Sequence, residues 1–119
     1  MPEIKVADQR IQDLLCCALE GGSNYWIAGC RKGYPAGKTR EDYKFPHLEL
    51  PLTEGGSLII DPGEGEEPKT LDRAACLRGL QVMADKYPKD FADFLAENDD
   101  ADTGDVFLQC ALFGEVIFG

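Results

Sequence analysis

The strongest constraint on the fold is a helical periodicity that recurs in three separated segments. Residues 8–20 place apolar side chains at the i, i+3, i+4, i+7 and i+8 positions of one helical face. Comparable apolar faces recur over residues 70–86 and 103–113. Each segment is therefore predicted to be a helix with one buried face. The predicted N-terminal caps are Asp8, Thr70 and Asp102.

Short runs of strand-forming residues lie between these helices. We expect strands over residues 24–30, 46–52, 57–60 and 115–118. The second and third of these strands are expected to pair as a hairpin, and a fourth helix is expected to open at Pro88. Short clustered strands mixed with helices predict an α+β fold, in which a small antiparallel sheet packs against three or four helices. The length of 119 residues predicts a single domain, 1–119.

The charge is strongly acidic and unevenly distributed. Twenty-two Asp and Glu residues against twelve Lys and Arg residues give a net charge of −10. Residues 31–44 are an exception, because they contain five cationic residues and only two acidic residues. An acidic loop is expected over 61–69. The overall excess of acids argues against a protein that binds nucleic acid directly.

The location expected from the sequence is the cytoplasm. No apolar run approaches the roughly 18 residues that a membrane span needs. The first ten residues lack the basic and apolar regions of a signal peptide. The five cysteines are an odd number, and no CxxC pair occurs among them. We therefore expect reduced thiols in a cytoplasmic setting, with no metal site and no cofactor.

Two acidic or glycine-rich motifs come close to known ligand loops without matching them. The sequence GYPAGKT at 33–39 is one residue too short for a phosphate loop of the P-loop type. The acidic run at 97–105 lacks the ligand spacing of a calcium-binding EF-hand. No serine or cysteine nucleophile has a motif around it that would activate it. We therefore assign no catalytic residue and favour a function other than catalysis, with a small enzyme as a minor alternative.

The most unusual local sequence is EGGSNYW, residues 20–26. It combines glycine, small polar side chains and two aromatic rings, which suits a pocket for a base or a ribose. The nearby cations could hold the phosphates of such a ligand. The candidate ligand-binding residues are Ser23, Asn24, Tyr25, Trp26, Arg31, Lys32, Lys38 and Arg40. The alternative is that the glycines only end a helix and that one of the aromatic residues belongs to the core.

Two segments carry a resemblance to a known group of proteins. ALEGGSNYW at 18–26 and DVFLQCALFGEVIFG at the end of the chain resemble a family of small proteins encoded by bacteriophages and prophages. The resemblance covers residues 18–26 and 102–119. It implies an accessory phage protein that acts in the cytoplasm of a bacterial host. Accessory phage proteins of this size often counter host defence.

Two functions follow as expectations. The first is sequestration of a small nucleotide-like signal of a bacterial immune system. The second is an acidic inhibitor, similar to an anti-CRISPR protein, that occupies the basic nucleic-acid cleft of a host defence protein. A virion-assembly role is a minor third. We also expect a homo-oligomer, because the apolar run at 106–118 exceeds what one small core would absorb.

Overall fold

The computed structural model describes residues 6–63 and 65–119, so the first five residues and Glu64 of the predicted acidic loop lie outside it. The elements are, in chain order, α1 (Asp8–Cys17), the π-helical turn η1 (Ala18–Gly22), β1 (Gly29–Gly33), the 3-10 turn η2 (Arg40–Asp42), α2 (Pro46–Glu49), the 3-10 turn η3 (Leu50–Leu52), β2 (Ser57–Asp61), β3 (Lys69–Leu71), α3 (Arg73–Lys86), α4 (Pro88–Leu95) and α5 (Ala101–Phe113).

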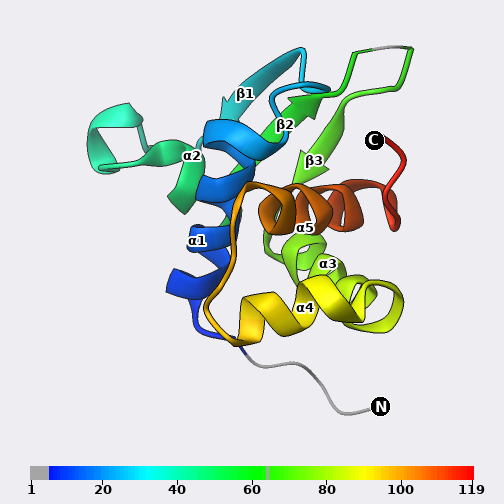
Figure 1. The fold of residues 1–119 in the computed structure, drawn as a ribbon. Helices are drawn as coiled ribbons and strands as arrows, with labels where there is room; N and C mark the ends of the chain where they lie inside the picture. The colour runs from blue at the N-terminus through cyan, green and yellow to red at the C-terminus, as the bar shows by residue number, and fades with distance from the viewer. Residues whose placement is uncertain (1–5, 64) are drawn as a thin grey trace.

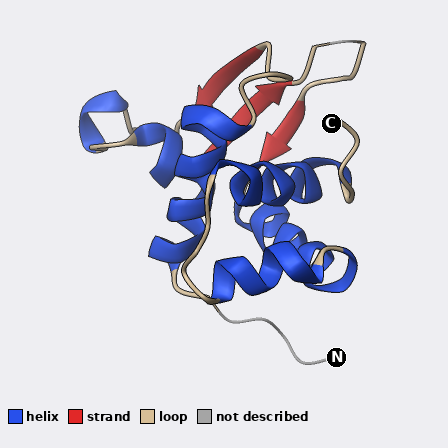
Figure 2. Cartoon of the chain, in the orientation of Figure 1, coloured by secondary structure: helices blue, strands red, loops and turns tan. Residues whose placement is uncertain are grey.

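The sheet is a three-stranded antiparallel meander in the order β1-β2-β3. The strands lie together at one end of the molecule, and α1, α3, α4 and α5 pack beneath them (Figures 1 and 2). This arrangement confirms the predicted α+β fold. Leu58 pairs with Leu71, and both are fully buried on the face towards the helices. The opposite face carries the row Arg31, Ile59 and Thr70.

Helix α5 is the centre of the core. It packs against α1, α3, α4 and β3, and its Phe107 and Leu108 are fully buried. The apolar C-terminal run is thus largely absorbed by the core of a single chain. The apolar character of this run therefore does not argue for a homo-oligomer. The homo-oligomer stays a prediction. In the described part of the chain, no helix has the length and apolar character that crossing a membrane requires.

The strand predicted over 46–52 is wrong. Residues 46–49 form α2 and residues 50–52 form η3. Pro46 and Pro51 explain the difference, because proline donates no ladder hydrogen bond and its fixed φ suits the first turn of a helix. The predicted hairpin therefore does not form, and β2 pairs with β1 and β3 instead.

The strand predicted over 24–30 begins later than expected, and the strand predicted over 115–118 is absent from the structure. Residues 23–26 form a turn, in which the backbone N–H groups of Trp26 and Ile27 both donate to the Ser23 carbonyl. Residues 115–118 contact the body through side-chain hydrogen bonds rather than through a strand ladder.

Two of the predicted caps lie two residues away from the caps that the structure has. Thr70 lies in β3, and α3 is capped by Asp72, whose carboxylate accepts from the Ala75 N–H at 2.9 Å. Asp100, rather than Asp102, caps α5 by accepting from the Thr103 N–H at 3.0 Å. The third predicted cap is also wrong, because the N-cap of α1 is Ala7. Asp8 is the first residue of the helix, and its carboxylate forms a bidentate pair with Arg73.

Gly104 allows α5 to lie directly against α1. A Cβ atom at this position would lie 2.6 Å from the Cys17 Cβ, 2.7 Å from the Ala18 nitrogen and 2.8 Å from the Leu14 carbonyl oxygen. Two of these three neighbours are backbone atoms, which cannot move without shifting the helix. The close approach of the two helices therefore requires glycine.

Gly104→Ala should destabilise the protein by about 1–3 kcal/mol, the usual cost of overpacking a core. This loss would arise although alanine has the higher helix propensity by about 1 kcal/mol. Gly21→Ala is the matched control, because a Cβ there meets nothing within 4 Å. Urea unfolding of both variants measures the difference. Equal stability of the two variants would contradict the close packing of α1 and α5.

Candidate functional site

The segments 18–26 and 102–119 meet around one buried carboxylate, that of Asp105 on α5. Its Oδ1 accepts a hydrogen bond from Ser23 Oγ at 2.8 Å and another from Trp26 Nε1 at 2.7 Å. Its Oδ2 accepts from the Tyr25 hydroxyl at 2.6 Å. Three of the four residues in the SNYW sequence therefore donate to the same carboxylate.

Gln109, one turn further along α5, extends this network to the end of the chain. Its Nε2 donates to both Asp105 oxygens at 3.2 Å. Its Oε1 accepts from the backbone N–H groups of Ile117 and Phe118, both at 2.8 Å. The C-terminal segment thus obtains from side chains the hydrogen bonds that a sheet would otherwise supply.

Trp26 is a core residue in this structure. Only 3% of it is exposed. Its ring stacks on Phe118, with centroids 5.1 Å apart and planes 11° apart, and it meets Phe113 edge-on. Phe118 therefore lies where a stacked base would have to lie. Of the four candidate residues at 23–26, Trp26 and Ser23 are buried, whereas Asn24 and Tyr25 are exposed.

Tyr25 acts as a hydrogen-bond donor within this network. Burial of its hydroxyl, followed by the hydrogen bond to Asp105, raises the pKa of Tyr25 to about 12. The phenol therefore stays protonated at neutral pH and keeps donating to the carboxylate. We conclude that the network around Asp105 has a structural role.

The basic segment, residues 31–44, has a different character. Its five cations are all exposed, and none of them forms an ion pair within the described part of the chain. The two carboxylates of the segment are occupied by other donors. Asp42 accepts from the Thr39 N–H at 2.8 Å, and Glu41 accepts from the Thr39 hydroxyl at 2.9 Å.

The structure distributes the four predicted cations over more than one surface. Arg31 points to the outer face of the sheet, opposite Ile59. Lys32 is the next residue along β1, so its side chain points to the other face, beside Leu58. Lys38 and Arg40 belong to the stretch after β1 that leads to α2. One small ligand therefore contacts only part of the predicted set.

A surface hollow lies at the end of the sheet, between residues 53–57, Thr70 and the start of α3. Its hydroxyl groups would suit a polar ligand, but its charges do not favour an anion. Glu54 and Asp72 line it, and the Arg73 guanidinium there is already held by Asp8 and by the Leu52 carbonyl. The basic segment is accordingly the better anion-binding surface.

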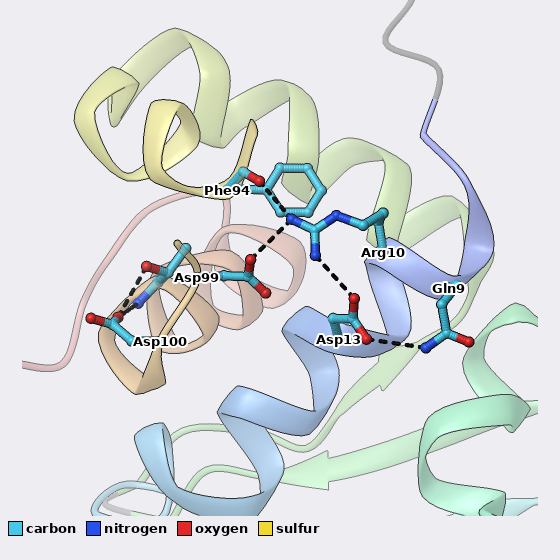
Figure 3. Close-up of polar contacts among 7 residues, drawn as sticks. Gln9, Arg10, Asp13, Phe94, Asp99 and Asp100 are labelled. Atoms are coloured by element: carbon cyan, nitrogen blue, oxygen red, sulfur yellow. Dashed lines mark hydrogen bonds and ion pairs between the residues drawn. The ribbon is translucent and has the colours of Figure 1, made fainter. Parts of the chain in front are cut away.

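The acidic run at 97–105 is largely used to hold the fold together. Figure 3 shows Arg10 of α1 between Asp13 and Asp99, with each oxygen 2.9 Å away, while the same guanidinium donates to the Phe94 carbonyl. Arg10 also lies over the Phe94 ring, 4.7 Å from its centroid. Since Asp100 caps α5 and Asp105 is buried, only Glu97 and Asp102 of the run's five acids are left as exposed side chains without such a role.

A surface cluster of Cys16, Glu20 and His47 lacks the properties of a nucleophilic site. The Cys16 thiol donates to Glu20 at 3.1 Å, and this bond together with burial raises the pKa of Cys16 to about 11. The thiol is therefore protonated at neutral pH, and His47 contacts Glu20 rather than sulfur. Within residues 6–63 and 65–119, no three His, Cys, Asp or Glu side chains are grouped so that they could hold a metal ion.

Comparison with protein-family models, with curated proteins and with solved structures finds no match to this chain. The assignment of a site therefore depends on the geometry above.

Two residues of the Asp105 network, Asp105 and Gln109, are absent from the set predicted from sequence. Their spacing in the sequence could have indicated them. The two polar residues lie at i and i+4 within the apolar sequence of α5, on its buried side. A buried charge on a core helix requires several donors from elsewhere in the chain. The sequence does not indicate which donors these are, because Ser23 lies 82 residues from Asp105.

Asp105→Asn should lower the free energy of unfolding by about 2–4 kcal/mol, because an amide cannot accept all the donors that face the carboxylate. Asp102→Asn is the matched control, since it removes the same charge from an exposed position three residues earlier. Its effect should stay within about 0.5 kcal/mol. Denaturant unfolding followed by the fluorescence of Trp26 gives both values. Similar losses for the two variants would contradict the role of Asp105.

Proposed function

We propose that this protein is a phage-encoded accessory protein that binds a small, anionic, nucleotide-like immune signal and sequesters it intact. The observation that supports the proposal is the basic segment: five exposed cations without an ion-pair partner among the described residues, on a protein with a net charge of −10. Cations that the fold leaves uncompensated are positioned to neutralise an anion from outside.

The local charge limits the size of the ligand. The acidic remainder of the protein would repel a long polyanion, whereas a ligand with one or two phosphates can stay within the positive field of the segment. Arginine contacts to phosphate are charge-assisted hydrogen bonds, which are shorter and stronger than neutral ones. The proposed site keeps Lys38 and Arg40 and no longer uses Trp26 or Ser23, which are buried.

A binding role fits the chemistry of the described residues better than catalysis does. The Cys16 thiol is protonated, and its neighbour Glu20 is shared with His47. The acids of the run at 97–105 are largely engaged in caps, ion pairs and the buried network. The proposal therefore includes no bond cleavage.

An inhibitor of a basic host protein remains the second candidate. The observation that favours it is an acidic surface formed by the exposed Asp61 at the end of β2 and the exposed Glu66 and Glu67 in the β2–β3 loop. This loop extends away from the helices (Figure 1). Such a protein would bind through the acidic loop, and its affinity would fall as the salt concentration rises.

Calorimetry of the protein against cyclic di-AMP, cyclic di-GMP and ADP-ribose should find a ligand with a dissociation constant in the micromolar range or below. Replacing both Lys38 and Arg40 by alanine should weaken its binding about tenfold or more, since each step of 1.4 kcal/mol is tenfold. Arg78→Ala is the control, because Arg78 is also an exposed arginine but lies on α3.

The ligand should be recovered unchanged after the complex is denatured by heat. Recovery of a cleaved ligand would contradict sequestration and would show that the protein is an enzyme. Failure of all three nucleotides to bind, together with a salt-sensitive complex with a basic defence protein, would favour the inhibitor.

A further inference from the structure

We infer that the stacking surface for the ligand's base is formed by Tyr34, Tyr43 and Phe45, an aromatic set that lies on the basic segment and its edge. This inference rests on the proposed function and specifies its ligand as an anion with a planar base. It also replaces the aromatic residues expected from the sequence. Trp26 is covered by Phe118, and the Tyr25 hydroxyl is bonded to Asp105.

The first part of the surface is a pair of tyrosine rings. The centroids of Tyr34 and Tyr43 are 5.9 Å apart, and the planes are tilted by 37°. The pair brings together the two ends of residues 35–42, which contain Lys38 and Arg40. The cations and the aromatic rings therefore belong to one local unit of the chain.

The second part is Phe45, which is 49% exposed. Its backbone N–H donates to the Glu49 carboxylate at 2.6 Å, which fixes the main chain at the start of α2 while its ring stays accessible. The Lys44 ammonium lies 5.4 Å from the centroid of this ring. A large exposed ring with a cation beside it offers both stacking and charge to the same ligand.

The position of the segment suits capture of a free molecule. The chain before α2, around η2, stands out at the side of the packed helices (Figure 1). A base has two faces that can stack on any aromatic ring, so this surface selects for planarity and negative charge. The protein's overall negative charge favours a free mono- or dinucleotide over the end of a nucleic-acid strand.

Phe45→Ala and Tyr43→Leu test this surface, with calorimetry against cyclic di-AMP, cyclic di-GMP and ADP-ribose. Each substitution should weaken the binding nucleotide about tenfold, since stacking contributes roughly 1–3 kcal/mol per base. Tyr43→Phe keeps the ring and should bind like the unmodified protein. Leu95→Ala, on α4, is the control for loss of an exposed apolar side chain and should also leave binding unchanged.

The fluorescence of Trp26 reports whether each variant keeps the native core, because it is the only tryptophan. Native variants that bind the nucleotide as tightly as the unmodified protein would overturn the stacking surface and leave the proposed function standing. Absence of any nucleotide binding by the unmodified protein would overturn both. Tighter binding of a ten-nucleotide single strand than of all three free nucleotides would overturn the inferred ligand class.

Discussion

The buried carboxylate of Asp105 is the interaction on which the rest of the structure depends. A carboxylate on a core helix is costly unless several donors replace the water that it loses. Ser23, Tyr25, Trp26 and Gln109 supply those donors. Satisfying this one charge therefore fixes the turn after α1 against α5, and through Gln109 it also fixes the end of the chain.

This arrangement separates structural residues from the proposed binding residues. The segments 18–26 and 102–119 meet in the interior, where Trp26 lies between Asp105 and the rings of Phe113 and Phe118. The stretch between β1 and α2 contributes exposed cations, the exposed ring of Phe45 and the half-buried rings of Tyr34 and Tyr43 instead. The interior determines the shape of the protein, and the exposed stretch carries the charge and the aromatic faces from which we infer its ligand.

Sequence periodicity was sufficient for the long helices because α1, α3 and α4 each pack against α5 and so bury their apolar faces. Periodicity was insufficient for residues 46–52. The alternating leucines there are compatible with a strand, but Pro46 and Pro51 favour the helical turns that the structure has. The predicted pocket at 23–26 depended on an interaction that local sequence does not contain. Trp26 and Asp105 are 79 residues apart. The sequence around Trp26 does not indicate whether its indole is buried or exposed.

The most direct test of this account is hydrogen exchange at the indole N–H of Trp26, which gives one NMR signal because the chain has one tryptophan. The hydrogen bond of 2.7 Å to Asp105 and the covering ring of Phe118 predict exchange only through global unfolding, with the protection set by the full stability of the protein. An indole N–H that exchanges as fast as in a free peptide would contradict the buried network. It would show that Trp26 is exposed and is again a candidate ligand-binding residue.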